Sequence, residues 1–201
     1  MTIWMLARST GMAALIAFTL STALGALTAS PKSVTSSDQL DRRFLKQMAH
    51  RSAAVIGLTL LLAHAILIIV DSFVDVSITG ALVPFAAGYR PVALGAGTLS
   101  VYAIAAVAVS GALRGRVATS AASARRWRYV HLSAYAGWAL AMGHGIFAGT
   151  DTGASWATAV YAACGATVLA AVITRLVAER NHRATPLPEA RARSFAARSR
   201  S

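Results

Sequence analysis

The chain has 201 residues, of which 56% are hydrophobic and only 13% are charged, so its composition is too apolar for an ordinary soluble domain. Its formal net charge is +12 at pH 7. Alanine and leucine dominate and period-2 alternation is absent, which argues against a β-barrel. The same composition favours a helical bundle, which satisfies its backbone hydrogen bonds inside lipid.

Five stretches are long and apolar enough to cross a hydrocarbon core about 30 Å thick, which takes roughly 20 helical residues each. They lie at residues 3–28, 50–70, 93–113, 129–148 and 155–177. The first stretch has only Arg8 before its apolar core and is longer than the core of a usual signal peptide, so we expect a retained helix. The predicted fold class is therefore all-α, an integral membrane bundle with five transmembrane helices.

The basic residues indicate how these spans are oriented. All but two of the 19 Lys and Arg lie in residues 31–51, 114–128 and 175–201, whereas acidic side chains lie on the other side at Asp71, Asp75 and Asp151. The positive-inside rule then places the N-terminus outside the cell membrane and the C-terminus in the cytoplasm. We expect this basic face to meet anionic lipids rather than nucleic acid.

The remaining segments carry little chemistry of their own. Residues 1–178 form the expected membrane domain and residues 179–201 a basic, disordered cytoplasmic tail. The 71–92 connection is expected to contain a short amphipathic piece on the outer surface. The single cysteine, Cys164, is expected to pack within the fifth span, and we find no internal repeat, P-loop or dinucleotide fingerprint.

Four of the five histidines lie in two of the spans: His50 and His64 in the second, His131 and His144 in the fourth. These spans run in the same direction, so the first histidine of each lies near the inner surface and the second near the outer surface. At a rise of 1.5 Å per residue the two levels are roughly 20 Å apart. Imidazoles inside lipid are costly and normally face a partner or a cavity.

Helical angles fit this arrangement on one span and not on the other. His50 and His64 are fourteen residues apart, within about 40° of the same face, and Gly57 lies midway, where a flat macrocycle would approach the backbone. His131 and His144 are thirteen apart, about 140° out of phase in a straight helix. A kink would correct this at Gly137, Gly143 or Gly145; otherwise the two sites meet the fourth span from different sides.

Several chemistries compete for these histidines. A proton relay wants carboxylates, and none lies inside a span. A zinc or non-haem iron site wants ligands that converge at one level. Interhelical hydrogen bonding by the imidazoles is the simplest alternative. Two bis-histidine haems b, each held by one imidazole from each helix, fit the two levels best.

The histidine-bearing segments resemble the ferric-reductase-like transmembrane domain family, membrane b-type cytochromes related to the NADPH oxidases. The resemblance covers roughly residues 3–178 and rests on "LARSTG", "MAHRSAAVIGLTLLLAHAI", "VPFAAGYRPVALGAGTLSVY" and "WRYVHLSAYAGWALAMGHGIFAGTDT". It implies His50, His64, His131 and His144 as haem iron ligands. The oxidase relatives have an additional N-terminal helix and cytoplasmic flavin and nicotinamide domains, whereas this chain ends in a short basic tail.

The resemblance implies a membrane electron carrier, the transmembrane component of an oxidoreductase. A cytoplasmic flavin-containing reductase would supply electrons to the inner haem, and an external acceptor such as ferric iron would take them from the outer one. Two other classes stay open: a haem-binding membrane anchor subunit of a redox complex, and a haem-free structural membrane protein.

A few further side chains have expected roles. Arg8 is a candidate cation for the propionates of the outer haem, and its alternative is snorkelling to the headgroups. Trp4, Trp127 and Trp156 lie near span ends and read as interface anchors. Trp138 lies in the middle of the fourth span and is expected to pack there.

Overall fold

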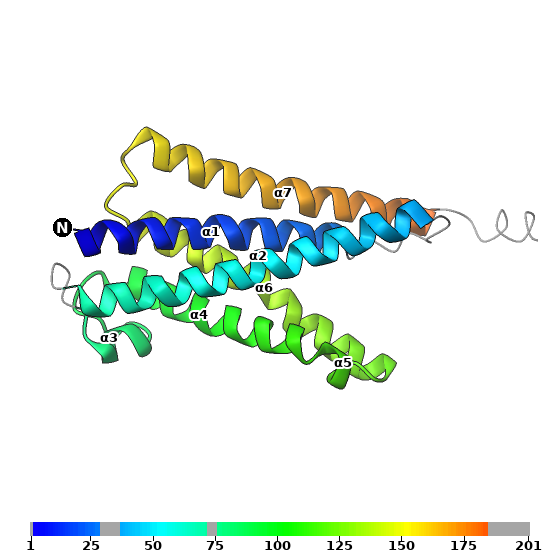
Figure 1. Ribbon diagram of the computed structural model, residues 1–201, viewed down its shortest axis with the longest axis horizontal. Coiled ribbons are helices and arrows are strands. Elements are labelled where there is room, and N and C mark those ends of the chain that lie inside the picture. The colour runs from blue at the N-terminus through cyan, green and yellow to red at the C-terminus, as the bar shows by residue number, and fades with distance from the viewer. Residues whose placement is uncertain (1, 29–36, 72–75, 185–201) are drawn as a thin grey trace, which may run out of the picture.

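The computed structural model of the chain consists of helices and loops, with no strand in the residues that it describes, namely 2–28, 37–71 and 76–184 (Figure 1). The side chains of the last helix are described up to Asn181. The expected outer residue Asp75 and the tail from residue 185 lie outside these ranges. The helices are α1 Thr2–Thr28, α2 Ser37–Val70, α3 Ile78–Leu82, α4 Pro91–Ala112, α5 Arg114–Val117, α6 Ala121–Ala148 and α7 Ser155–Ala184.

Three helices are longer than the apolar stretches inside them. α2 begins at Ser37 rather than at residue 50, and α7 continues past residue 178 to Ala184. α6 begins at Ala121, where Ser120 and Ser123 bond to each other's backbone N–H groups in a capping box. These extensions arise because helical propensity and capping continue beyond the apolar run.

Four of the described helices are long and apolar enough to cross a membrane, and they indicate a membrane protein: α1, α2, α4 and α7. α6 has the length but is not among them, so composition does not confirm the fifth expected span. The reason lies in its own sequence, because His131 and His144 lower its hydropathy together with tyrosine, tryptophan, serine and glycine.

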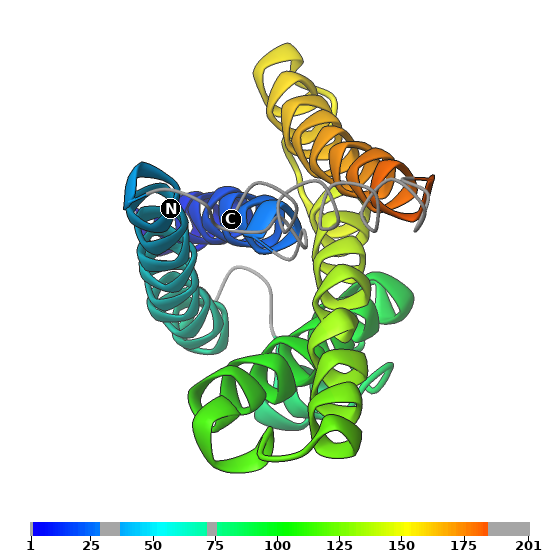
Figure 2. The same cartoon turned by 90° about the vertical axis from the view of Figure 1, so that its right-hand side faces the viewer.

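α1 lies in the centre of the bundle. It packs against α2, α6 and α7, while α4 packs against α6 (Figure 1). Its buried positions are mostly small, including Ala7, Ala14, Ala23 and Ala26, and small residues let membrane helices approach closely. In contrast, α2 and α6 are not a packed pair, and Figure 2 shows them on opposite sides of the molecule.

The outward faces are apolar, as a lipid-facing bundle requires. Leu62 of α2 and Leu169 of α7, for example, are 63% and 61% exposed. Cys164 is buried on α7, which confirms its expected packing role. The short α3 follows the connection after α2, where a short piece was expected, and packs against α4 through a hydrogen bond from the Thr98 hydroxyl to the Ala81 carbonyl at 2.9 Å.

The basic segments gather at one end of the bundle. Figure 1 shows the N-terminus of α2, the α5 corner and the C-terminus of α7 together at that end. The N-terminus of α1, α3 and the α6–α7 connection lie at the other end, with Asp71 and Asp151. The charge asymmetry in the sequence is therefore also an asymmetry in space.

Candidate functional site

The four histidines of the spans meet in two pairs, one near each end of the bundle. The ring centroids of His50 and His131 lie 6.3 Å apart with an interplanar angle of 66°. The centroids of His64 and His144 also lie 6.3 Å apart, at 73°. These are the pairs that helix direction and depth predict. They join α2 to α6, two helices whose backbones do not pack together.

Each of these rings is held from behind by a neighbouring helix. α1 holds the rings of α2: His64 Nδ1 donates to the Ala7 carbonyl at 2.7 Å and His50 Nδ1 to the Ser21 carbonyl at 2.8 Å. α4 holds the rings of α6. His144 Nδ1 donates to the Ala93 carbonyl at 2.9 Å.

The fourth ring, that of His131, is held less tightly. Its Nδ1 lies 3.3 Å from the Ser110 hydroxyl, which itself donates to the Val107 carbonyl at 2.8 Å. Ser110 is therefore left to accept from Nδ1. Across the described residues, all four rings use Nδ1 for their hydrogen bonds, so each Nε2 keeps its lone pair.

Four glycines make room for these four rings. A Cβ atom on Gly97 would lie 2.7 Å from His144 Nδ1, and one on Gly11 would lie 2.8 Å from His64 Nδ1. At the inner level the fit is looser, with 3.2 Å from Gly25 to His50 Cε1 and 3.6 Å from Gly111 to His131 Cε1. α1 and α4 therefore have no side chain at the positions where an imidazole packs against their backbone.

The thirteen-residue spacing on α6 does not prevent either pair. The expected kink is not needed, since α6 is one continuous helix and runs obliquely to α2 (Figure 1). Because α6 crosses α2 obliquely, it presents one side to α2 near one end of the bundle and a different side near the other end. This is the alternative that the thirteen-residue spacing left open. Gly137 instead marks a close approach of α6 to α4, since a Cβ there would lie 3.1 Å from Ala103 Cβ.

The 6.3 Å spacing has a physical meaning. A metal–imidazole bond is about 2.0 Å long, and the centre of a five-membered ring with bonds of about 1.33 Å lies about 1.1 Å from its atoms. Two imidazoles on opposite sides of one ion thus have centroids about 6.2 Å apart. A direct N–H···N hydrogen bond of about 2.9 Å would bring the centroids to about 5.1 Å. The centroid distance of 6.3 Å in both pairs is closer to the first value than to the second.

The ligand count agrees with this geometry. In the described parts of the chain, no three histidine, cysteine or carboxylate side chains gather as they would in a zinc cage. Each level instead brings together two imidazoles from two different helices, α2 and α6.

A packed layer separates the two levels. Phe18, Ile104 and Trp138 meet there with leucines of α2, and the Trp138 indole donates to the Thr19 hydroxyl at 2.9 Å. Trp138 is thus a packing residue, as expected. Gly57 was expected to face a macrocycle, but the structure places Phe18 against it, with a would-be Cβ 2.8 Å from the Phe18 ring.

Trp127 has a role at the inner level that its position near a span end did not suggest. Its ring stacks on that of His131 with centroids 4.8 Å apart, and its Nε1 donates to the Ser110 carbonyl at 2.8 Å. The Arg114 guanidinium lies 4.7 Å from the centre of the indole. The sequence did indicate this contact, because Trp127 and His131 are four residues apart and residues at that spacing share a helix face.

Arg8 lies on α1 next to Ala7, whose carbonyl holds His64. Arg8 forms an ion pair with Asp151 of the α6–α7 connection. Its Nε is buried and has no hydrogen-bond partner among the described residues. Arg8 is therefore held by Asp151 with its Nε buried, rather than snorkelling freely.

No family model, curated protein or solved structure matches this chain. The functional argument consequently rests on the histidine geometry and on the residues that support it. The resemblance seen in the sequence motifs stays an expectation.

The sequence reading missed most of the supporting residues. Gly11 and Gly25 are fourteen apart, as are Gly97 and Gly111, and this spacing equals that of His50 and His64 on the antiparallel neighbour. This shared spacing could have been found in the sequence. Ala7 and Ala93 act through their backbone carbonyls, so their side chains gave no indication.

Proposed function

We propose that this chain is a five-span membrane cytochrome b that carries electrons across the bilayer, from a cytoplasmic flavin-containing reductase to an external acceptor such as ferric iron. The observation that carries the proposal is the matched spacing of the two histidine pairs, 6.3 Å at each level. Independent support comes from the separation of α2 and α6, which meet through imidazoles rather than through packed backbones.

The four histidines are the residues that would hold two b-type haems. His50 and His131 would hold the inner one, and His64 and His144 the outer one, each through Nε2. The hydrogen bonds on Nδ1 fix the tautomer and the ring orientation that a metal ligand needs. Each haem, when bound, supplies a one-electron redox centre. Arg8, through its free Nε, is the cation offered to an outer propionate.

The same arrangement supports the fifth span and the orientation. α6 must cross the membrane beside α2 for its histidines to meet partners at both levels. The basic ends of α2, α4 and α7 would then face the cytoplasm. A reduced flavin there would pass on its two electrons one at a time and release its two protons into the cytoplasm, while two ferric ions outside would each take up one electron and become ferrous.

The pairing is tested by removing one histidine at a time. His64→Ala and His144→Ala should each abolish the same outer haem and leave the inner one, and His50→Ala and His131→Ala should each abolish the inner one. Haem content and reduced-minus-oxidised spectra of the purified protein measure this. His182→Ala, which changes the fifth histidine, is the control and should keep both haems.

Two results would overturn the proposal: a wild-type protein without b-type absorption bands, or loss of different haems by the two members of one pair. Electron transfer is tested separately in liposomes, with a reduced flavoprotein inside and a ferric chelate outside. Ferrous iron should appear outside only with the wild-type chain. Bound haem without transfer would instead identify an anchor subunit.

A further inference from the structure

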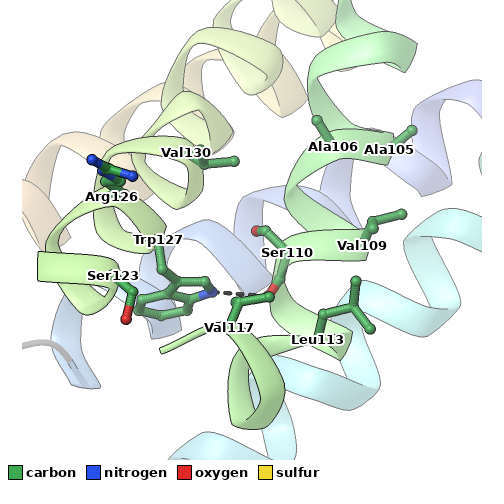
Figure 3. Close-up of a pocket in the computed structure, with 10 residues that line it drawn as sticks. All are labelled: Ala105, Ala106, Val109, Ser110, Leu113, Val117, Ser123, Arg126, Trp127 and Val130. Atoms are coloured by element: carbon green, nitrogen blue, oxygen red, sulfur yellow. Dashed lines mark hydrogen bonds between the residues drawn. The ribbon is translucent and has the colours of Figure 1, made fainter. Parts of the chain in front are cut away.

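A hollow lies at the corner where α4, α5 and α6 meet, beside the inner histidine pair. Its volume is about 640 Å³. Figure 3 shows the Trp127 indole reaching from α6 towards Ser110 and Val117, with side chains of α4 beyond it. The lining is mostly aliphatic and consists of Ala105, Ala106, Val109, Ser110, Leu113, Val117, Ser123, Arg126, Trp127 and Val130.

A second, smaller hollow of about 360 Å³ shares the Trp127 indole with the first. This basic hollow is formed by two arginines, Arg114 and Arg128, with Gly115, Ala118, Ala124 and Trp127. The sequence has no aspartate or glutamate from residue 76 to residue 150, so no carboxylate of this segment neutralises them. One indole thus separates an apolar hollow from a cationic one.

The two hollows adjoin at the Trp127 indole, one of them mostly aliphatic and the other basic. From Leu113 at the corner to Ala105 the aliphatic lining follows α4 for about 12 Å towards the middle of the bundle. Val109 is 57% exposed and Val130 is 46% exposed, so this lining faces outward. The two arginines flank the indole near the basic end, because Arg114 follows Leu113 directly at the start of α5 and Arg128 follows Trp127 on α6.

We propose that this corner binds one phospholipid with an anionic headgroup. Its phosphate would lie between Arg114 and Arg128, and an acyl chain would follow the aliphatic hollow from Leu113 to Ala105. Trp127 would mark the boundary between them, the position that tryptophan favours at a membrane interface. The proposal rests on the membrane-spanning arrangement of the proposed function and not on the haems.

The pairing of the two hollows selects this ligand over others. A soluble phosphate would use the arginines and leave the aliphatic hollow empty. A zwitterionic or neutral lipid would fill the hollow and leave two guanidinium groups without a net counter-charge. Because Trp127 also stacks on His131, the bound lipid would lie one ring away from the inner pair. The inner site would thereby sense which lipids surround it.

Lipid retention by the full chain tests the proposal without reference to haem. In native mass spectrometry from detergent, one phosphatidylglycerol should stay bound at activation energies that strip phosphatidylcholine. Arg114→Gln with Arg128→Gln should abolish this adduct. Arg116→Gln with Arg125→Gln removes the same charge from the same corner without touching either hollow, and it should keep the adduct.

The aliphatic half is tested in the same way. Ala106→Phe fills the hollow and should abolish retention with all arginines present, whereas Ala139→Phe, at an exposed alanine of α6 outside the hollow, should not. Equal losses in both arginine pairs would mean only general charge attraction and would overturn the proposal. So would displacement of the lipid by glycerol phosphate, which would indicate a simple phosphate site. Undiminished retention in Arg114→Gln with Arg128→Gln, together with weaker reduction by the flavoprotein, would assign the corner to protein docking instead.

Discussion

Each imidazole of the two pairs is supported by a hydrogen bond behind it and by a glycine beneath it. The outer level is held the more firmly, with carbonyl bonds of 2.7 and 2.9 Å on His64 and His144. The inner level combines the 2.8 Å carbonyl bond of His50 with the long 3.3 Å contact of His131. The residues around the rings therefore predict different behaviour for the two levels.

The glycines give a test with a built-in control on one helix. In Gly97→Ala the new Cβ would lie 2.7 Å from His144 Nδ1, so the ring must shift and its bond to Ala93 weakens. We expect haem affinity at the outer level to fall about 10-fold or more, the usual effect of disturbing the partner of a metal-bound histidine. Gly111→Ala, where the nearest His131 atom is at an ordinary 3.6 Å, should leave haem content unchanged.

Ser110 gives a second test at the residue scale. Ser110→Ala removes the hydrogen bond of His131 Nδ1, so inner haem affinity should fall about 10-fold and the inner haem should be lost first on dilution. Ser133→Ala is the control, because that hydroxyl bonds only to the Val130 carbonyl of its own helix at 2.6 Å. Spectra recorded during haem extraction measure both. Equal loss from the two levels in Ser110→Ala would contradict the role given to Ser110.

The residues that sequence reasoning located and those it missed differ in kind. Helix rise and direction alone determine which histidines share a depth, so the pairs were predictable from four positions. The stacking of Trp127 on His131 depends on a rotamer, and the Ala7 and Ala93 carbonyls belong to helices whose neighbours a single sequence does not reveal. Arg8 was located correctly near the outer level, but its ion pair with Asp151 depends on a loop conformation.

At the scale of elements, small residues set how closely the helices approach one another. α4 and α6 meet at Gly137, whose carbonyl also accepts a hydrogen bond from the buried Ser100 hydroxyl at 2.9 Å. α1 and α2 meet where Phe18 covers Gly57. In each helix pair, the contact at the middle of the bundle lies between the two histidine levels and fixes the height at which each ring is presented.

Gly137 and Gly143 make a matched pair for testing that contact. Gly137→Leu would push its side chain into Ala103 and Ile104, and overpacking of this kind costs about 1–3 kcal/mol. Gly143→Leu has no atom within 4 Å of its Cβ and should be tolerated. Thermal unfolding in detergent measures the difference. Equal melting temperatures for the two variants would show that α4 and α6 do not meet closely there.

The helix boundaries were predictable only where the apolar run ends at the same place as the helix. α1 and α4 follow the expected ranges within two residues, because in both the apolar run and the helix end at nearly the same residue. α2 and α6 continue into polar sequence, where hydropathy gives no signal. The fifth expected span differs from these. The histidines that would give α6 its function also lower its hydropathy, so hydropathy does not mark α6 as a span.

At the scale of the whole molecule, the number of spans decides which side each end occupies. Reporters inserted at Gly115, at Gly153 and after Arg180 separate the alternatives, and both glycines have open space around them. With five spans, the first and third should be cytoplasmic and the second external. If α6 did not cross, Gly115 and Gly153 would lie on the same side and Arg180 on the opposite one. Paired reporters that are active only inside or only outside the cell measure this.

The glycine and histidine spacings have a consequence for the architecture as a whole. α1 carries Gly11 and Gly25 and is followed by the histidines of α2; α4 carries Gly97 and Gly111 and is followed by those of α6. Each half thus has the same order, a helix with two glycines fourteen residues apart followed by a helix with two histidines, although no repeat is visible in the sequence. Internal repeats are a common way of building membrane bundles.

The two halves differ in what supports their rings. At the outer level the halves agree, with an alanine carbonyl behind each ring. At the inner level they differ, because only the second half has Trp127 stacked on its histidine and Arg114 over the indole. The two halves therefore differ most at the level of His50 and His131, the level that would receive electrons under the proposed function.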